Sequence, residues 1–91
     1  MQYCVYLLIS NHKNKIFTYV GYTKNLQKRL NLHNISRGAK YTKGRKWIVF
    51  HKEIYDSKSK AMSREYKLKK DRKFRNFIKK KFMKKNNSLL Y

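Results

Sequence analysis

The chain has 91 residues, of which 25 are Lys or Arg and four are Asp or Glu, so its formal net charge is +21. A content of 41% hydrophobic and 15% aromatic residues excludes a disordered basic tail, and one Cys with three His excludes a zinc finger. This length and charge predict a single domain that binds a polyanion such as nucleic acid; a membrane surface is not expected, because basic residues lie in every segment rather than on one amphipathic face.

The apolar segments of the chain predict three β-strands. They cover residues 2–10, 16–22 and 46–55. The first segment is almost continuously apolar, which is typical of a central strand buried on both faces. The polar residues 11–15 predict a hairpin loop, so the first two strands are expected to pair with each other. The third strand has its apolar centre at residues 47–50.

Capping residues and helical periodicity predict three helices. The first is capped by Thr23 or Asn25 and runs to about Ile35. The candidate caps of the second helix are Asp56, Ser57 and Ser59. The third helix begins near Asp71, and its apolar residues follow the helical period at Phe74, Phe77, Ile78 and Phe82.

The resulting order is β-β-α-β-α-α, which predicts an α+β fold. Its simplest form is a three-stranded antiparallel sheet flanked by helices. Residues 1–85 are expected to form this single domain, and residues 36–45 a basic loop within it. Residues 86–91 are expected to be a frayed C-terminal tail.

The lone Cys4 bears on the cellular compartment. It lies within the first predicted strand, where a free cysteine is expected to be a small buried hydrophobe rather than a nucleophile. One cysteine can form no internal disulfide, and this fits a reducing compartment. The chain shows neither a signal peptide nor an apolar run long enough to span a membrane, so a cytoplasmic protein is expected.

Two tyrosines on the first two strands are candidate site residues. Tyr6 and Tyr19 are ordinary half-buried strand tyrosines on pattern alone, since the chain has eight tyrosines. However, a tight hairpin brings both phenols to the same end of the sheet. Gly21 follows Tyr19 by two residues, and a glycine within a strand often marks a close approach of another group.

Arg29 and His33 are four residues apart, so on a helix they project from one face. A solvated charged face is the usual fate of such residues. Both nevertheless flank the apolar pair Leu26 and Leu30, which places them at the border between core and solvent, where a cleft wall lies. Arginine suits a bidentate grip on phosphate and keeps its charge.

Glu65 shares a helix face with the apolar residues Ala61 and Leu68. Its ordinary role is an ion pair with Lys69, worth only about 0.3 to 0.5 kcal/mol. A carboxylate that faces the core costs free energy unless it is paired or coordinates a cation. Mg²⁺ prefers one or two carboxylates together with waters and phosphate oxygens, so a single glutamate is sufficient for a metal site.

These residues, in this order, resemble the GIY-YIG nuclease superfamily, in particular its small standalone members close to the catalytic domain of the excision-repair nuclease UvrC. The first signature triplet corresponds to residues 4–6 and the second to residues 19–21, with Cys4 in place of the name-giving glycine, a position that is loose in the standalone group. The segment 38–45 also resembles the linker of that group. The resemblance covers roughly residues 2–80.

The resemblance implies the same three-stranded fold and a metal-dependent DNA endonuclease that leaves 5′-phosphate and 3′-hydroxyl ends, with little sequence specificity and a setting in DNA repair. Mg²⁺ or Mn²⁺ is the implied cofactor, with Glu65 as its ligand. The implied catalytic residues are Tyr6, Tyr19, Arg29 and His33, with Gly21 as a structural glycine. Either Tyr6 or His33 is the general base, and Tyr19 positions the water.

The basic loop is the expected nucleic-acid contact. Charge and an aromatic ring, the combination that grips a single strand, occur together at Lys40, Tyr41, Lys43 and Arg45. The expected partner is DNA, single-stranded or branched, without an obligatory protein partner. The alternative is an RNA-binding or architectural protein without catalysis, against which the lone inward carboxylate argues.

Overall fold

The structure, a computed structural model, describes residues 2–90, with side chains described as far as Lys85. Its elements are β1 (Tyr3–His12), β2 (Lys15–Thr23), α1 (Leu26–Asn34), the short 3₁₀ helix η1 (Lys40–Thr42), β3 (Ile48–Tyr55), α2 (Lys58–Lys70) and α3 (Arg72–Leu90). The strands form one antiparallel sheet in the order β2-β1-β3. The predicted α+β fold and element order are therefore confirmed.

The hairpin between β1 and β2 is tighter than the sequence predicts. The strands pair as far as His12 and Lys15, so the connecting loop holds two residues instead of the expected 11–15. These are Lys13 and Asn14, with φ of 51° and 64°. Two residues with positive φ are typical of a type I′ turn, whose twist matches that of the strands. Because the loop is short, the strands keep their pairing along their full length.

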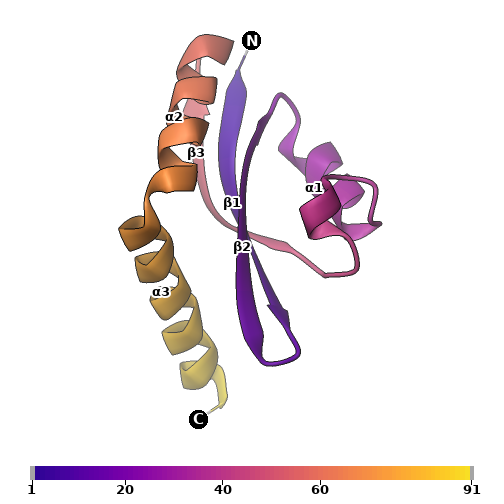
Figure 1. Cartoon of the computed structure of the whole chain (residues 1–91), viewed down its shortest axis with the longest axis vertical. Helices are drawn as coiled ribbons and strands as arrows, with labels where there is room; N and C mark the ends of the chain where they lie inside the picture. The colour runs from indigo at the N-terminus through magenta and orange to yellow at the C-terminus, as the bar shows by residue number, and fades with distance from the viewer. Residues whose placement is uncertain (1, 91) are drawn as a thin grey trace.

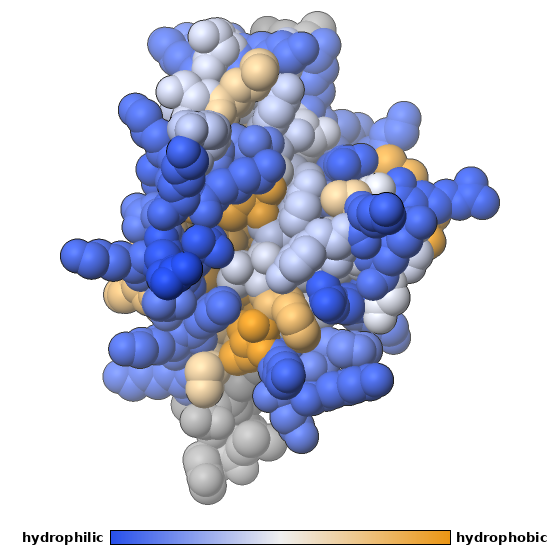
Figure 2. All heavy atoms as spheres, in the orientation of Figure 1, coloured by the Kyte–Doolittle hydropathy of each residue, from blue (hydrophilic) through white to orange (hydrophobic). Residues whose placement is uncertain are grey.

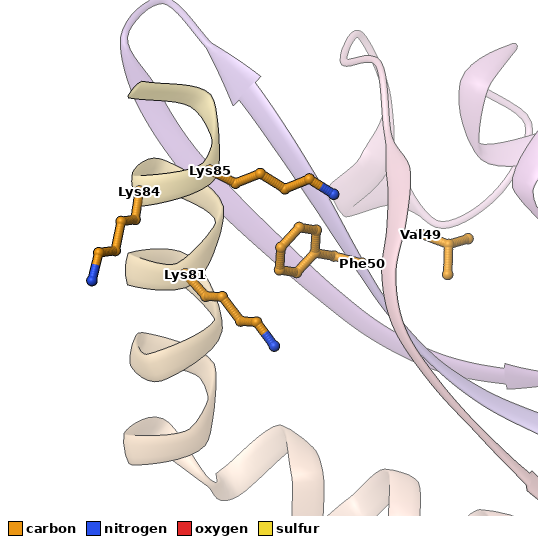
Figure 3. Close-up of a pocket in the computed structure, with 5 residues that line it drawn as sticks. All are labelled: Val49, Phe50, Lys81, Lys84 and Lys85. Carbon is orange, nitrogen blue, oxygen red and sulfur yellow. The ribbon is translucent and has the colours of Figure 1, made fainter. Parts of the chain in front are cut away.

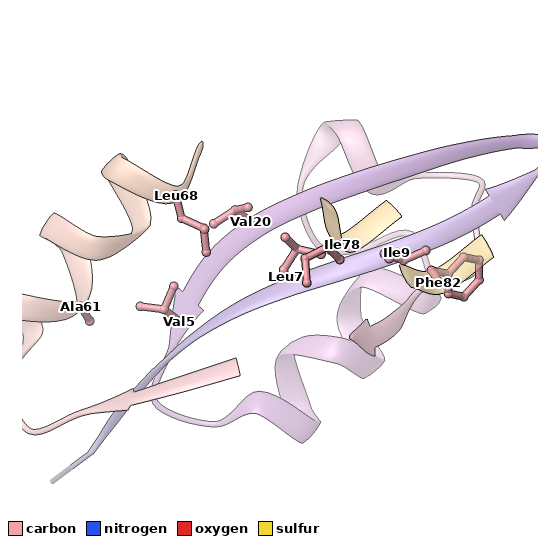
Figure 4. Packing of buried hydrophobic residues seen from close by; sticks show 8 residues of the cluster. All are labelled: Val5, Leu7, Ile9, Val20, Ala61, Leu68, Ile78 and Phe82. Atoms are coloured by element: carbon pink, nitrogen blue, oxygen red, sulfur yellow. The ribbon is translucent and has the colours of Figure 1, made fainter. Parts of the chain in front are cut away.

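The sheet is covered on both faces, which explains the continuous apolar run of β1. Figure 1 shows α2 and α3 along one face and α1 on the other. Val5, Leu7 and Ile9 pack toward α2 and α3, in a cluster that also contains Ala61, Leu68, Ile78 and Phe82 (Figure 4). The alternate residues of β1 pack toward α1, with Trp47. Cys4 is one of them and is buried, as expected.

The third strand begins later than predicted, because Trp47 bonds to α1 instead of to the sheet. Its backbone N–H donates to Asn34 Oδ1 at 2.6 Å, and the Asn34 amide donates to the Trp47 carbonyl at 3.1 Å. The indole is 2% exposed, whereas Ile48 is 51% exposed. The expected apolar centre at residues 47–50 is therefore split, with Trp47 serving the loop before the strand.

Each α-helix begins at a side chain that accepts a hydrogen bond from a free backbone N–H group. Asn25 accepts from Lys28 N at 3.1 Å at the start of α1, and Ser57 accepts from Lys60 N at 3.2 Å at the start of α2. Of the expected alternatives, these are the two caps that form. Asp71 ends α2 and accepts from the N–H of Phe74 at 2.9 Å, which starts α3.

The apolar face of α3 is narrower than its sequence period predicts. Ile78 and Phe82 are buried, and Phe82 packs edge-on against Phe50 with ring centroids 5.5 Å apart. Phe77 is 58% exposed, which corrects its expected core position. It points away because α3 rests on the sheet along a single stripe.

Two expectations concern the ends and the environment of the chain. Within residues 2–90, no helix combines the length and apolar character needed to cross a membrane. The expected frayed tail, residues 86–91, falls where side chains are not described, and Tyr91 lies outside the described residues; the tail therefore stays a prediction.

Candidate active site

The phenol of Tyr6 extends from the central strand across its neighbour. Tyr6 is 1% exposed and lies opposite Gly21 of β2 in the sheet register. A Cβ atom at Gly21 would lie 2.6 Å from the ring carbon Cζ of Tyr6 and still closer to its hydroxyl. A residue with a side chain therefore cannot replace Gly21 unless the phenol moves. The glycine admits the Tyr6 ring to the space between β2 and α1.

Tyr19 lies on the same face of the sheet, two residues from Gly21 along β2. It pairs with Leu8, and its ring centroid is 6.4 Å from that of Tyr6 and 5.0 Å from the imidazole of His33. The other face of the Tyr19 ring stacks on Tyr41, with centroids 6.2 Å apart and planes at 23°. The hairpin thus brings both phenols together, as the sequence predicts.

His33 connects the Tyr6 phenol to the loop that follows α1. Its Nε2 is 3.0 Å from Tyr6 Oη, and its Nδ1 is 2.8 Å from Thr42 Oγ1. The side chain is fully buried, although the sequence predicts it at the border between core and solvent. Thr42 covers it, and Gly38 packs so closely that a Cβ there would lie 2.9 Å from His33 Cγ. Burial, followed by the charge of Arg29, lowers the pKa of His33.

Arg29 faces the same two phenols from α1, and it is half-buried at the border where the sequence places it. Burial raises the pKa of Tyr6 to about 12, although hydrogen bonding to Arg29 opposes this rise. In turn, hydrogen bonding to Tyr6 raises the pKa of Arg29, with a further contribution from Tyr19. The site therefore holds a permanent cation against the neutral phenol of Tyr6.

Glu65 approaches the site from α2, on the opposite side of the sheet from α1. Its side chain is 19% exposed and forms an ion pair with Lys69, with Nζ and Oε1 3.3 Å apart. Its charge also contributes to the raised pKa of Tyr6, so the carboxylate lies within electrostatic range of the phenol. The structure thus shows the i+4 pair of Glu65 with Lys69, while the role of Glu65 as a metal ligand stays a prediction.

The side chains of the site suit a divalent cation to which the protein supplies only some of the ligands. Among the described residues, no group of three or more His, Cys, Asp or Glu side chains could form a metal centre. A half-buried carboxylate near a neutral phenol fits Mg²⁺ or Mn²⁺, which keep several waters and accept phosphate oxygens as ligands. The residues present therefore fit a cation whose coordination the substrate completes.

The basic loop presents an aromatic ring and a cation beside the site. Tyr41 is 50% exposed, and the Arg45 guanidinium lies 5.0 Å from its ring centroid and 3.9 Å from that of Phe17. Arg45 also donates to the Tyr41 carbonyl at 2.9 Å. Lys40 and Lys43 are exposed. The structure therefore joins Tyr41 and Arg45 to the site, and leaves the two lysines on the surface beside it.

Sequence reasoning missed the residues that support His33. Thr42 is fully buried, and its carbonyl accepts from the indole Nε1 of Trp47 at 2.9 Å. The contacts of Thr42 with His33 and with Trp47 leave no periodic pattern in the sequence, because Thr42 and Trp47 lie in or beside a loop. The sequence therefore carried no signal for the contact between Thr42 and His33.

A second polar cluster lies on β3, away from the phenols. Glu53 accepts from Arg64 Nε at 2.8 Å and from the Tyr55 hydroxyl at 2.6 Å, and contacts His51 Nε2 at 2.7 Å. The hydrogen bond from Arg64 is the main reason that the pKa of Glu53 falls to about 2. This cluster ties α2 to the sheet.

Comparison with known proteins shows the family of this chain. The family model of the GIY-YIG catalytic domain matches residues 2–87. A UPF0213 protein of Halobacterium salinarum is 52% identical over 52 residues, which are 56% of this chain and 68% of that protein. A UPF0213 protein of Oceanobacillus iheyensis is 41% identical over 69 residues, 75% of this chain and 77% of the other.

Other relatives match over a smaller share of their own length. The matched segment of a UPF0213 protein of Bacillus velezensis is 43% identical and covers 70% of this chain but 63% of the relative. Among solved structures, the solution NMR structure of a UPF0213 protein from Bacillus halodurans is 33% identical, with a TM-score of 0.47 over 87% of this chain and 84% of that one.

Proposed function

This chain belongs to the GIY-YIG family of catalytic domains, a nuclease superfamily, and we propose that it is a metal-dependent endonuclease that hydrolyses DNA phosphodiester bonds. One observation carries the proposal: the neutral, buried phenol of Tyr6 lies 3.0 Å from the imidazole of His33 and within range of the charges of Arg29 and Glu65. A base, a fixed cation and a carboxylate around one hydroxyl are the groups that phosphodiester hydrolysis requires.

In this mechanism each side chain acts at a stated atom. Tyr6 Oη takes a proton from the attacking water while its own proton passes to His33, or His33 takes the water proton directly. Tyr19 positions the water. The guanidinium of Arg29 neutralises the charge that develops on the phosphate oxygens. The bond from phosphorus to the 3′ oxygen breaks, and the leaving oxygen takes a proton from solvent, which leaves 5′-phosphate and 3′-hydroxyl ends.

Glu65 is the residue that would hold Mg²⁺ or Mn²⁺ at this site. When bound there, the cation would supply Lewis-acid chemistry for the phosphate and the leaving oxygen. A single carboxylate makes cation affinity depend on the substrate, which contributes phosphate oxygens of its own. The protein without DNA is therefore expected to bind the cation weakly.

Nucleic acid is the substrate that the surface favours. Figure 2 shows one face of the molecule, on which hydrophilic side chains surround smaller hydrophobic patches. Between α3 and β3 lies a groove, here called the α3 groove, which is lined by Val49, Phe50, Lys81, Lys84 and Lys85. In Figure 3 the side chains of Lys81 and Lys85 extend toward the ring of Phe50. Ammonium groups beside an aromatic ring suit a nucleic-acid backbone and its bases.

Cleavage assays with magnesium and then with a chelator test the proposal. The full chain should cut plasmid and oligonucleotide DNA with Mg²⁺, and EDTA should stop the reaction. Glu65→Ala should abolish cleavage while DNA binding persists or improves, because a negative charge beside the phosphate is lost. Asp56→Asn, which removes a carboxylate whose side chain is 81% exposed, is the matched control and should cut normally.

Two results would contradict this proposal in different ways. Magnesium-dependent cleavage that survives in Glu65→Ala would remove Glu65 as the metal ligand. Tight DNA binding without any cleavage by the unsubstituted chain would instead favour the second candidate, a nucleic-acid-binding protein without catalysis, which the basic surfaces also suit.

A further inference from the structure

The hydroxyl of Thr42 is placed where it can control the histidine of the site. Thr42 lies in η1, and both Thr42 and His33 are fully buried. Its Oγ1 is 2.8 Å from His33 Nδ1 and 2.9 Å from the carbonyl oxygen of Ala39. His33 Nε2 faces Tyr6 Oη at 3.0 Å. Four polar groups therefore form one chain: the Ala39 carbonyl, the Thr42 hydroxyl, the imidazole and the Tyr6 phenol.

The number of protons available to these four groups determines which group donates and which accepts in each hydrogen bond. If Thr42 donates to the Ala39 carbonyl, its oxygen accepts from Nδ1–H, and Nε2 is free to accept the proton of Tyr6. In the reverse direction Nε2–H donates to Tyr6, whose oxygen also faces the obligate donor Arg29. The buried Tyr6 proton then has no acceptor among the contacts of the described residues. Because a buried hydroxyl without an acceptor destabilises the folded protein, the first direction prevails.

We infer that Thr42 is a positioning residue, which holds His33 in the Nδ1–H tautomer so that Nε2 can accept the proton of Tyr6. This inference rests on the proposed function for its catalytic consequence, but the tautomer itself is a property of the protein without substrate. It also decides between the two general bases that the mechanism above allows. Tyr6 receives the proton of water, and His33 receives the proton of Tyr6.

The proton transfers balance without another reactant. As the water oxygen bonds to phosphorus, one water proton moves to Tyr6 Oη and the Tyr6 proton moves to Nε2. His33 becomes imidazolium, donating from Nδ1 to Thr42 and from Nε2 to the phenol oxygen. The proton on Nε2 then returns to solvent through Tyr6. In the other tautomer Nε2 already carries a proton, so this relay cannot begin.

The loop around Thr42 is built to keep this hydroxyl in place. The Thr42 backbone N–H donates to the Ala39 carbonyl at 3.1 Å, and the Thr42 carbonyl accepts from Trp47 Nε1 at 2.9 Å. Both bonds use main-chain atoms and survive when the side chain changes. Thr42→Val is close in shape to threonine and removes the hydroxyl alone, whereas Thr42→Ser keeps the hydroxyl and removes a methyl group.

The experiment measures the tautomer directly. The ¹⁵N chemical shifts of the imidazole, recorded on the full chain without DNA or metal, distinguish a protonated from an unprotonated ring nitrogen. His12→Asn and His51→Asn variants assign the signals of the remaining histidine. We expect protonated Nδ1 and unprotonated Nε2 in His33 of the unsubstituted protein and of Thr42→Ser, and a mixed or reversed tautomer in Thr42→Val.

Turnover measured in parallel links the tautomer to the reaction. Thr42→Val should lose about 10- to 100-fold in kcat with little change in KM, part of the gain that general-base catalysis supplies. Thr42→Ser should stay within about threefold of the unsubstituted protein, as should Thr18→Val, a threonine-to-valine control on β2.

The outcomes separate this inference from the proposed function. An Nε2–H tautomer in the unsubstituted protein overturns the inference, and so does an unchanged tautomer in Thr42→Val, even if its activity falls. A protein with the expected tautomers that never cleaves DNA keeps the role of Thr42 in setting the tautomer and overturns the proposed function instead.

Discussion

The phenol of Tyr6 lies beside the guanidinium of Arg29 and the imidazole of His33, and these two groups together with burial determine its protonation. Arg29 favours the phenolate, but burial outweighs that effect and raises the pKa to about 12. A phenol with this pKa is neutral over the physiological range and cannot act as a standing base. It can still pass a proton on, because an imidazole with a lowered pKa lies next to it.

The pH profile of turnover follows from the raised pKa of Tyr6 and the lowered pKa of His33. Because the pKa of His33 is below its ordinary value of 6.5, the neutral imidazole is already the main form at pH 6.5, and activity should fall only below that pH. Between about pH 7 and 9 kcat should be nearly flat, since Tyr6 keeps its proton until about pH 12.

Single-turnover rates at fixed Mg²⁺ over about pH 5 to 9 test this profile. His33→Asn, which cannot take up the proton, should lower the rate throughout and remove the fall on the acid side. A tenfold rise in rate per pH unit above pH 7 would show that the reaction waits for an ionisation, and would refute the relay through neutral Tyr6.

Arg29 is the residue at which charge and geometry can be separated. Its guanidinium contacts both phenols, and a lysine supplies a point charge without the planar fork. Arg29→Lys should therefore lose nearly as much turnover as Arg29→Ala, roughly 10²- to 10³-fold, the scale of one preorganised electrostatic donor. DNA affinity should change little, because 24 other basic side chains remain of the 25.

Turnover at saturating DNA for both variants measures the effect, with Arg37→Lys as a control, an exposed arginine after the same helix. If Arg29→Lys cuts within about threefold of the unsubstituted protein, Arg29 belongs to the general basic surface, and the mechanism loses its electrophile.

Among the elements, α2 is fixed to the sheet by charge as well as by apolar packing. Ala61 and Leu68 are fully buried against β1, and Arg64 binds both oxygens of Glu53 on β3, at 2.8 and 3.0 Å. Glu65 follows Arg64 directly on the helix, so the position of its carboxylate depends on this attachment.

Acid should weaken this attachment. The pKa of Glu53 is lowered from 4.5 to about 2, so its stabilisation is fully present above about pH 4.5 and is lost as pH falls toward 2. Glu53→Gln should reduce the free energy of unfolding at pH 7 by about 2 to 3 kcal/mol, and the difference from the unsubstituted protein should shrink as pH approaches 2.

Urea unfolding at several pH values measures this difference, and Asp56→Asn is again the control, since its carboxylate is exposed and pairs with Lys60. A Glu53→Gln variant whose loss of stability is the same at pH 3 as at pH 7 would mean that packing, not ionisation, causes the loss.

The elements also show what sequence reasoning can reach. The strand–hairpin–strand pattern was enough to predict that Tyr6 and Tyr19 lie together, and the i+4 spacing was enough to predict that Arg29 and His33 share a helix face, because both are local geometric rules. The meeting of the two pairs in one site was implied by the family resemblance alone. Thr42 was out of reach, since a loop side chain leaves no period. The partner of Glu53 was equally hidden, because Arg64 lies 11 residues away on another element.

At Trp47 the apolar pattern of the sequence predicts a strand residue, but the structure places Trp47 in the loop before β3. A tryptophan before an isoleucine and a valine reads as the start of a strand, and periodicity in a short apolar run cannot say otherwise. The deciding interaction is the pair of hydrogen bonds with Asn34, and a polar contact across 13 residues has no hydrophobic signal.

At the scale of the whole molecule, charge is spread over several surfaces and not concentrated at the site. The loop beside Tyr41 and the α3 groove belong to different parts of the chain, and α1 and α3 cover opposite faces of the sheet (Figure 1). A substrate that contacts both must follow the surface around an edge of the sheet. Binding should therefore involve several phosphates at once and depend strongly on salt.

The salt dependence of binding makes this prediction quantitative. If about six phosphates of duplex DNA are neutralised, a plot of log K against log salt should have a slope near −5, because each phosphate contributes about −0.9. Lys81→Ala should reduce the magnitude of the slope by about 1 if the α3 groove takes part, whereas Lys58→Ala, at the other end of the α2–α3 pair, should leave it nearly unchanged.

Fluorescence anisotropy with a labelled oligonucleotide, in EDTA so that nothing is cut, gives the binding constants. Equal slopes for Lys81→Ala and the unsubstituted protein would remove the groove from the interface, and a nearly flat plot for all variants would mean that the basic surface does not serve nucleic acid.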